Sequence, residues 1–208
     1  PKIEVFLFDH TTATTHLKAK KIIDKFYESK RSILIGTNMA LPYLSKPVDL
    51  CAIISYEATR ALPTWRAEET IFSLLVRLRE IALKDVIVQL RTEPDELLQS
   101  ASRGLIEQFY DGEIEIRKAL KYPPYSVFVL LAWMGSKEQT ALTEASLQKT
   151  FEAYNVQFYS APQSSESKTV RYGLIRSDAG QWPIADLISK LQSLPPYIKI
   201  EINPDRIV

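Results

Sequence analysis

The chain has 208 residues, 46% of them hydrophobic, and its 26 basic and 25 acidic residues leave a formal net charge of +1. This length accommodates one large domain or two small ones, and we expect two. The near-neutral charge argues against a protein whose main role is to bind the phosphate backbone of nucleic acids, so any such contact must come from a local patch. The sequence has no apolar run of about 18 residues, which excludes a membrane-spanning helix.

The first half of the chain alternates strand and helix patterns. Apolar runs predict four strands, and apolar residues at helical spacing predict two helices between them, with Thr15 as the N-cap of the first. The strands are expected at 3–8, 32–37, 48–56 and 85–91, and the helices at 15–29 and 65–83. Strand–helix repetition with short connections favours a parallel sheet covered by helices, as in a RecA-like or doubly wound α/β lobe.

A different order of elements follows in the second half. A helical stretch is predicted from Pro94 to about Leu120, and the two prolines of "KYPPYS" (121–126) end it. Strands are then expected at 126–134, 156–162, 169–176 and 197–204, helices at 137–154 and 181–194, and a polar turn at 163–168. This βαββαβ order is typical of a ferredoxin-like α+β domain. We therefore predict two domains, 1–120 and 121–208.

Cysteine and histidine usage limits the metal and redox chemistry of the chain. Cys51, the single cysteine, lies in the apolar stretch "VDLCAIIS" and excludes an internal disulfide and a thiolate zinc site. A buried small hydrophobe is its expected role. His10 and His16 lack a carboxylate or thiol cluster at ligand spacing, so we expect no metal. The apolar N-terminal segment is too short for a secretory signal, and we expect a cytoplasmic protein.

Signatures of nucleotide binding and hydrolysis are also absent. A phosphate-binding loop needs closely spaced glycines followed by a lysine and a hydroxyl. The six glycines stand at 36, 104, 112, 135, 173 and 180, and no two fall within one such loop. The carboxylate pairs Glu68–Glu69 and Glu113–Glu115 are interpreted as exposed helix faces. We expect no catalytic residue and no cofactor in this segment.

Four separated motifs nevertheless resemble one family in the correct order. Asp9, Thr11 and Thr12 precede "ILIGTNM" (33–39), and "TWRAEET" (64–70), "YDGEIEIRKALKYPPYS" (110–126) and "EINP" (201–204) follow. Together they resemble the C-terminal part of the bacterial primosomal protein N′ family, the PriA-type replication restart DNA helicases. The resemblance implies the end of a second helicase lobe followed by a C-terminal domain. The chain opens on Pro1, which is consistent with a piece of a longer protein.

The chain departs from the family where the family's ATPase residues stand. The family's glycine- and histidine-bearing loop is replaced by "ALPYLSKPVD" (40–49), and its "QVAGRAGR" run by the glycine-free "LLVRLREIALK" (74–84). The family also has a zinc-binding cysteine cluster, of which Cys51 is not a part, so that cluster is expected either upstream of Pro1 or to have been lost. The expected motif remnants are Gly36, Thr37, Arg66, Arg77 and Arg79. On this basis we expect a degenerate helicase lobe without ATPase activity of its own in this segment.

The resemblance implies a binding function in DNA replication restart. Its expected partners are branched or single-stranded DNA, the acidic tail of single-stranded-DNA-binding protein, and other primosome proteins. An acidic, apolar-ended tail needs a cation and an apolar cleft. The residues expected to supply them, or to bind DNA, are Lys168, Arg171, Tyr172, Arg176, Gln181 and Trp182. Two alternatives stay open: the rear half of an active ATP-dependent 3′ to 5′ DNA helicase, or a purely structural primosome scaffold.

Overall fold

The computed structural model describes residues 3–61, 64–161 and 169–207 of the chain. Contacts between residues divide the chain into two compact units. Unit 1 contains the residues up to Tyr56 together with Phe72–Glu93, and unit 2 contains Glu57–Ile71 together with the chain from Pro94 onward. One long helix therefore begins in unit 2 and continues in unit 1.

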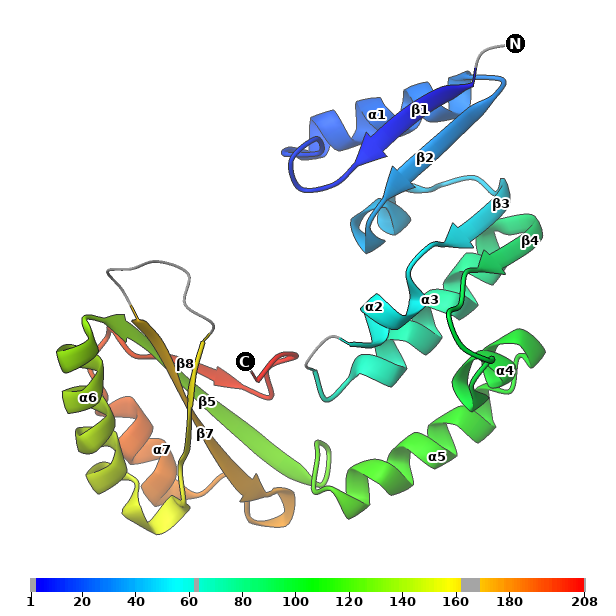
Figure 1. The fold of residues 1–208 in the computed structure, drawn as a ribbon. Coiled ribbons are helices and arrows are strands. Elements are labelled where there is room, and N and C mark those ends of the chain that lie inside the picture. The colour runs from blue at the N-terminus through cyan, green and yellow to red at the C-terminus, as the bar shows by residue number, and fades with distance from the viewer. Residues whose placement is uncertain (1–2, 62–63, 162–168, 208) are drawn as a thin grey trace. The chain divides into compact units, whose positions relative to one another are not determined.

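Unit 1 begins with a parallel pair of strands joined by a helix (Figure 1). The elements are β1 (Glu4–Phe8), α1 (His16–Glu28) and β2 (Ser32–Gly36). Thr15 caps α1 as expected, because its side chain accepts a hydrogen bond from the Lys18 amide. The buried side chains Phe8, Ala19 and Ile23 hold the helix against the strands. The strand–helix–strand unit predicted for this region is therefore present.

A second parallel pair completes unit 1. It consists of β3 (Val48–Ile53) and β4 (Ala82–Val88), and the 3-10 helix η1 (Asn38–Tyr43) precedes it in the chain. Helix α3 (Ala67–Ile81) runs directly into β4, so the fourth strand starts earlier than predicted. Within the described residues, β1 to β4 form two two-stranded sheets where one sheet was expected. The RecA-like arrangement stays a prediction.

The first part of unit 2 is helical. It contains α2 (Tyr56–Arg60) from Glu57 onward, the start of α3, α4 (Glu96–Arg103) and α5 (Ile106–Ala119). The single helical stretch predicted from 94 to 120 is divided at Gly104, whose φ of 71° ends α4. Asp95 caps α4 by accepting a hydrogen bond from the Leu98 amide. The prediction of one continuous helix is wrong because Gly104 ends α4 in the left-handed conformation that glycine adopts readily.

The rest of unit 2 is a four-stranded antiparallel sheet with two helices. The elements in chain order are β5 (Ser126–Gly135), α6 (Lys137–Thr150), η2 (Glu152–Tyr154), β6 (Gln157–Ser160), β7 (Thr169–Asp178), η3 (Ala179–Gln181), α7 (Ala185–Gln192) and β8 (Lys199–Ile202). The strands lie in the order β6-β7-β5-β8. The predicted βαββαβ order of elements is present, and the predicted turn at 163–168 lies outside the described residues.

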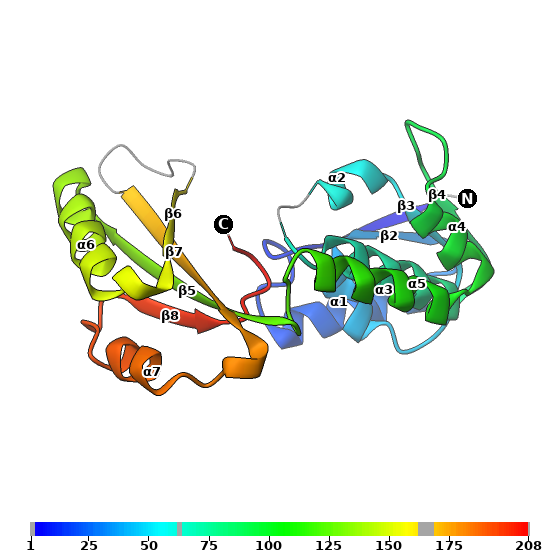
Figure 2. The same cartoon turned by 90° about the horizontal axis from the view of Figure 1, so that it is seen from below.

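The two sides of this sheet differ in what covers them. Helices α6 and α7 lie on one side (Figures 1 and 2), where Leu147 and Leu187 pack against Trp133 and Ile175. Because side chains alternate along a strand, the intervening residues face the other side. We call that side the open face and define it by Phe128, Leu130, Tyr172, Leu174 and Arg176. Trp65, Tyr122 and Ile207 pack on part of it.

The compact units do not coincide with the predicted domains, 1–120 and 121–208. Residues 57–71 and 94–120 cluster with the C-terminal sheet. The reason is long-range contact: Arg117 pairs with Glu69, and Trp65 lies against Phe128. The double proline remains the predicted domain boundary, but it does not separate the packed bodies. None of the helices that the structure describes is long and apolar enough to cross a membrane.

Candidate functional site

A row of four residues crosses the open face at one level, one from each strand. Tyr159 on β6 is the register partner of Tyr172 on β7, which pairs with Ala132 on β5, which pairs with Lys199 on β8. Both tyrosines are half-buried and Lys199 is exposed. The row therefore offers two aromatic rings on neighbouring strands and a cation at the far edge.

Two cations lie on the open face, Lys199 within the row and Arg176 beside it. The Arg176 guanidinium carbon lies 5.2 Å from the centroid of the Phe128 ring, and Arg176 is exposed and has no ion pair within the described part of the chain. Lys199 Nζ lies 2.5 Å from Glu201 Oε1, and the hydrogen bond to Glu201 raises the pKa of Lys199. Arg176 is thus the less compensated of the two charges.

Of the six residues predicted as one binding patch, the five that the structure describes do not all lie on one side of the sheet. Tyr172 and Arg176 lie on the open face, whereas Arg171 lies on the helix side of the sheet, where its Nε donates to Glu144 of α6 at 2.8 Å. Trp182 packs against the core on that same side, and Gln181 lies in η3. Lys168 is outside the described residues. Grouping Arg171 with Tyr172 was wrong because neighbours on a strand face opposite ways.

An ion-pair network lies next to the open face within unit 2. Arg66 Nε donates to Glu69 Oε2 at 2.8 Å, and Arg117 donates to Glu69 Oε2 at 2.9 Å and to Glu113 Oε1 at 2.8 Å. The hydrogen bond from Arg66, aided by the one from Arg117, holds the pKa of Glu69 below its usual range despite partial burial. Burial lowers the pKa of Arg117, but the hydrogen bonds to Glu113 and Glu69 outweigh it and leave that pKa raised.

This network corrects the expectation that these carboxylates form exposed helix faces. The Glu113 side chain is only 9% exposed and that of Glu69 only 19%, while Glu115 on the same helix is exposed. Arg117 pairs with both Glu69 and Glu113, because α5 and the start of α3 face each other. The expectation holds for Glu115 and is wrong for Glu69 and Glu113.

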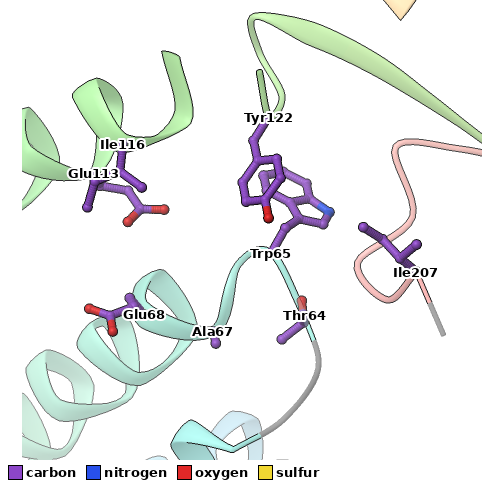
Figure 3. Close-up of a pocket in the computed structure, with 8 residues that line it drawn as sticks. All are labelled: Thr64, Trp65, Ala67, Glu68, Glu113, Ile116, Tyr122 and Ile207. Atoms are coloured by element: carbon purple, nitrogen blue, oxygen red, sulfur yellow. The ribbon is translucent and has the colours of Figure 1, made fainter. Parts of the chain in front are cut away.

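Trp65 joins the network to the sheet. Its Nε1 donates to the Pro204 carbonyl at 2.8 Å, and its ring centroid lies 4.8 Å from the Arg117 guanidinium carbon. Figure 3 shows the Trp65 ring next to the Tyr122 ring. The ring also meets Tyr122 and Phe128 edge to face. Trp65 thereby fixes the chain beyond β8, where Arg66 pairs with Asp205. Sequence reasoning gave Trp65 no role beyond the motif match.

The sequence of this chain is similar to those of several curated proteins of one kind. No protein-family model matches the chain. The replication restart protein PriA of Borreliella burgdorferi is 30% identical over 125 residues, which cover 57% of this chain and 19% of that protein. The PriA protein of Bacillus subtilis is 29% identical over 155 residues, which cover 72% of this chain and 19% of that protein. This chain is a relative of the PriA proteins.

The PriA protein of Thermotoga maritima gives the same result, at 24% identity over 156 residues that cover 73% of this chain and 21% of that protein. The chain therefore spans about a fifth of the length of the curated PriA relatives it matches. The resemblance expected from four sequence motifs is confirmed.

One motif that carries the PriA resemblance has a packing reason in unit 1. A Cβ at Gly36 would lie 2.7 Å from the Phe8 carbonyl oxygen, so only glycine allows β2 to approach β1 this closely. Thr37 donates its amide to the same carbonyl at 3.2 Å. Asp9 accepts hydrogen bonds from the hydroxyls and amides of Thr11 and Thr12, which hold its pKa far below the ordinary value. These residues stabilise the loop after β1.

The two arginines expected as remnants of the PriA-type ATPase motif lie on a regular helix. Arg77 and Arg79 are both exposed on α3, which continues without interruption from Ala67 to Ile81. Arg66, the third expected remnant, is held by Glu69 and Asp205.

The surroundings of Cys51 agree with the expected role of a small buried hydrophobe. Burial raises the pKa of its thiol. Among the described residues, no three His, Cys, Asp or Glu side chains gather as metal ligands.

Besides Ala132, the sequence reasoning missed two residues of the row, Tyr159 and Lys199. Both lie on strands that were predicted correctly, but their membership of one row depends on the register between β6, β7, β5 and β8. A partial signal was available. Even-numbered residues of β7 share a face, so Tyr172 and Arg176 belong together and Arg171 does not.

Proposed function

We propose that this chain is part of a DNA replication restart protein of the primosome, and that it binds single-stranded or branched DNA on the open face of its four-stranded sheet. The observation that carries the proposal is the row Tyr159–Tyr172–Ala132–Lys199, together with the exposed Arg176. The PriA relatives support the restart function, since that is what their name describes.

The physical case rests on stacking and charge. Single-stranded DNA binds protein surfaces by stacking bases on aromatic rings while cations track the backbone. Neighbouring strands are about 4.8 Å apart, so Tyr159 and Tyr172 offer two ring faces side by side. Arg176 and Lys199 stand on the same face to meet phosphates. Because the net charge of the chain is only +1, DNA binding depends on a local group of cations such as this one.

Fluorescence anisotropy with a forked and a single-stranded oligonucleotide tests this proposal. Tyr172→Ala and Tyr159→Ala should each weaken binding by about 5- to 150-fold, the range that loss of one stacked base implies. Tyr110→Ala, on α5 and outside the row, is the matched control and should bind as the unchanged chain does. Equal affinity of all four proteins for both DNAs would contradict the proposal.

We propose further that the acidic tail of single-stranded-DNA-binding protein docks at Arg176. This exposed cation lies over the Phe128 ring, so charge and apolar surface stand together as such a tail needs. Arg171, predicted earlier for this role, already pairs with Glu144. Arg176→Ala should therefore weaken binding of an acidic tail peptide more than Arg171→Ala does. The reverse order would favour the original patch, which includes Tyr172, Gln181, Trp182 and Lys168.

We propose finally that this segment contributes no ATPase activity. The exposed positions of Arg77 and Arg79 on a regular helix support this, because a glycine loop that could aim them at a phosphate is absent from 74–84. The alternative is the rear half of an active ATP-dependent helicase. DNA-stimulated ATP hydrolysis by the full-length protein, lost on Arg77→Ala or Arg79→Ala, would establish that alternative. A chain that binds neither DNA nor tail peptide would instead act as a primosome scaffold.

A further inference from the structure

Basic side chains are concentrated on helix α1 of unit 1 and on the turn that follows it. The segment 16–31 contains six basic and two acidic residues. The basic ones are Lys18, Lys20, Lys21, Lys25, Lys30 and Arg31. Unit 1 has 12 basic and 8 acidic residues, whereas unit 2 has 14 basic and 17 acidic ones. This one segment therefore accounts for the whole basic excess of unit 1, while unit 2 is net negative.

Three of these lysines form a row on the surface of α1. Lys18, Lys21 and Lys25 are spaced i, i+3 and i+7, which places them on one face of the helix over about 10 Å. We call these three residues the basic stripe. The buried side chains Ala19 and Ile23 hold the other side of α1 against β1 and β2 (Figure 1). Because these core contacts fix the helix, the stripe is presented to solvent as a unit.

The charges of the stripe are not compensated by neighbouring carboxylates. All six basic residues of 16–31 are exposed, and none of them forms an ion pair with another described residue, although Asp24 and Glu28 lie on the same helix. Lys18 Nζ donates a hydrogen bond to Thr14 Oγ1 at 3.1 Å, and a hydroxyl leaves the charge unpaired. By contrast, Arg117 in unit 2 pairs with two carboxylates. The stripe is thus available to an anionic partner.

We propose that the basic stripe binds the phosphate backbone of duplex DNA, through contacts that do not depend on base sequence. Cations clustered along one face of a helix are the electrostatic pattern of such a surface. Each lysine that contacts a phosphate releases condensed counterions, so three contacts add strongly to affinity at low salt. Lys30 and Arg31, in the turn between α1 and β2, add further positive charge beyond the end of the helix.

The choice of a duplex follows from the side chains that accompany the stripe. Single-stranded DNA is held largely by bases that stack on aromatic rings. The described surface of α1 exposes no such ring, because its Phe26 and Tyr27 are both half-buried. A duplex keeps its bases stacked and its phosphates outside, so lysines can bind it without stacking. The choice of DNA among polyanions rests on the restart role proposed above, whereas the stripe itself belongs to unit 1 and is separate from the open face.

Fluorescence anisotropy of the full chain with a short blunt-ended DNA duplex, at several salt concentrations, tests the proposal. The triple variant Lys18→Ala, Lys21→Ala, Lys25→Ala should bind at least about tenfold more weakly at about 0.1 M salt. The slope of log Kd against log salt should fall by about 2 to 3, since each lost phosphate contact removes about 0.9. Alanine favours helix at exposed positions, so α1 should persist, and far-UV circular dichroism checks this.

Two further variants separate the stripe from net charge. Lys118→Ala, Lys137→Ala, Lys149→Ala removes the same charge from exposed helix positions of unit 2 and should change neither the affinity nor the slope. Asp24→Asn with Glu28→Gln removes both carboxylates from α1 and should tighten duplex binding about twofold to fivefold, because they repel phosphate. Glu107→Gln with Glu115→Gln, at exposed positions of α5, is the control for this gain and should not tighten binding.

Three outcomes would overturn the proposal. Equal losses in the two triple variants would show that only the net charge matters. A chain that does not bind the duplex, or that binds phosphatidylglycerol vesicles through the stripe lysines in its place, would exclude duplex DNA as the partner. Different affinities for two duplexes of unrelated sequence, lost together in the stripe variant, would indicate base recognition. Tyr172→Ala, which tests the open face with single-stranded DNA, should leave duplex binding unchanged, so the two proposals can fail separately.

Discussion

Glu69 Oε2 lies 2.9 Å from Arg117 Nη2, although the two residues are 48 positions apart in the chain. Arg117 also holds Glu113, and its side chain is only 12% exposed. This single arginine therefore neutralises two largely buried carboxylates from different helices. It is the main electrostatic link between the start of α3 and α5.

Removal of Arg117 should destabilise unit 2 strongly. Arg117→Leu leaves the buried Glu113 carboxylate without a partner, and the expected loss is about 3–5 kcal/mol of unfolding free energy. Urea unfolding followed by tryptophan fluorescence measures it, because Trp65, Trp133 and Trp182 all belong to unit 2. Lys118→Leu, at the exposed neighbouring position, should stay within about 0.5 kcal/mol of the unchanged chain. Equal losses in both variants would show that the ion pairs contribute nothing specific.

Two glycines should respond to alanine with opposite signs. At Gly36 the new Cβ would meet the Phe8 carbonyl at 2.7 Å, so Gly36→Ala should cost about 1–3 kcal/mol in unit 1. At Gly112, inside α5, a Cβ would meet nothing within 4 Å, and Gly112→Ala should stabilise unit 2 by about 0.5–1 kcal/mol. Amide hydrogen exchange in β1 and β2 reads out the first change, and tryptophan fluorescence the second. A harmless Gly36→Ala would mean that the two strands are less closely spaced.

The elements of the fold were predictable because local patterns encode them. Alternating or continuous apolar runs gave β1, β5 and β7 within a few residues, and helical spacing gave α1 and α6. The prediction that was wrong concerned the environment of two charged residues, Glu69 and Glu113. Glu69 and Glu113 were expected in solvent because carboxylates on helices usually are, and only tertiary packing places Arg117 over them.

The candidate site was predictable only in part for the same reason. The predicted patch contained Tyr172 and Arg176, which share a face of β7, but it also contained Arg171, which the alternation of side chains along a strand places on the opposite face. Tyr159 and Lys199 join them through register across three strand pairs, which depends on contacts up to dozens of residues apart. The role of Trp65 at the Pro204 carbonyl, 139 positions away, has no local signal at all.

Unit 2 should lose stability in acid in a way that Glu69 explains. Its pKa is depressed from the ordinary 4.5 by Arg66 and Arg117, so the folded state binds the proton more weakly than the unfolded state. The stabilisation is therefore fully present above about pH 4.5 and is lost as the pH falls through the folded-state pKa. Urea midpoints measured at several pH values between 7 and 3 should show a flatter profile for Glu69→Gln. Glu115→Gln should keep the steeper profile, and identical profiles for both would remove Glu69 as a cause.

Asn203 should tolerate aspartate and resist alanine. Its Oδ1 accepts from the Phe128 amide at 2.8 Å, its own amide donates to the Phe128 carbonyl at 2.7 Å, and its φ is 49°. Asn203→Asp keeps the acceptor and a residue type that adopts positive φ readily, so we expect a change below about 1 kcal/mol. Asn203→Ala leaves the buried Phe128 amide without its acceptor in an unfavourable backbone conformation, at a cost of about 1–3 kcal/mol. Tryptophan fluorescence in urea measures both, since Trp65 bonds the carbonyl of the next residue, Pro204. Equal stability of the two variants would mean that the Asn203 side chain does not hold the end of β8 to β5.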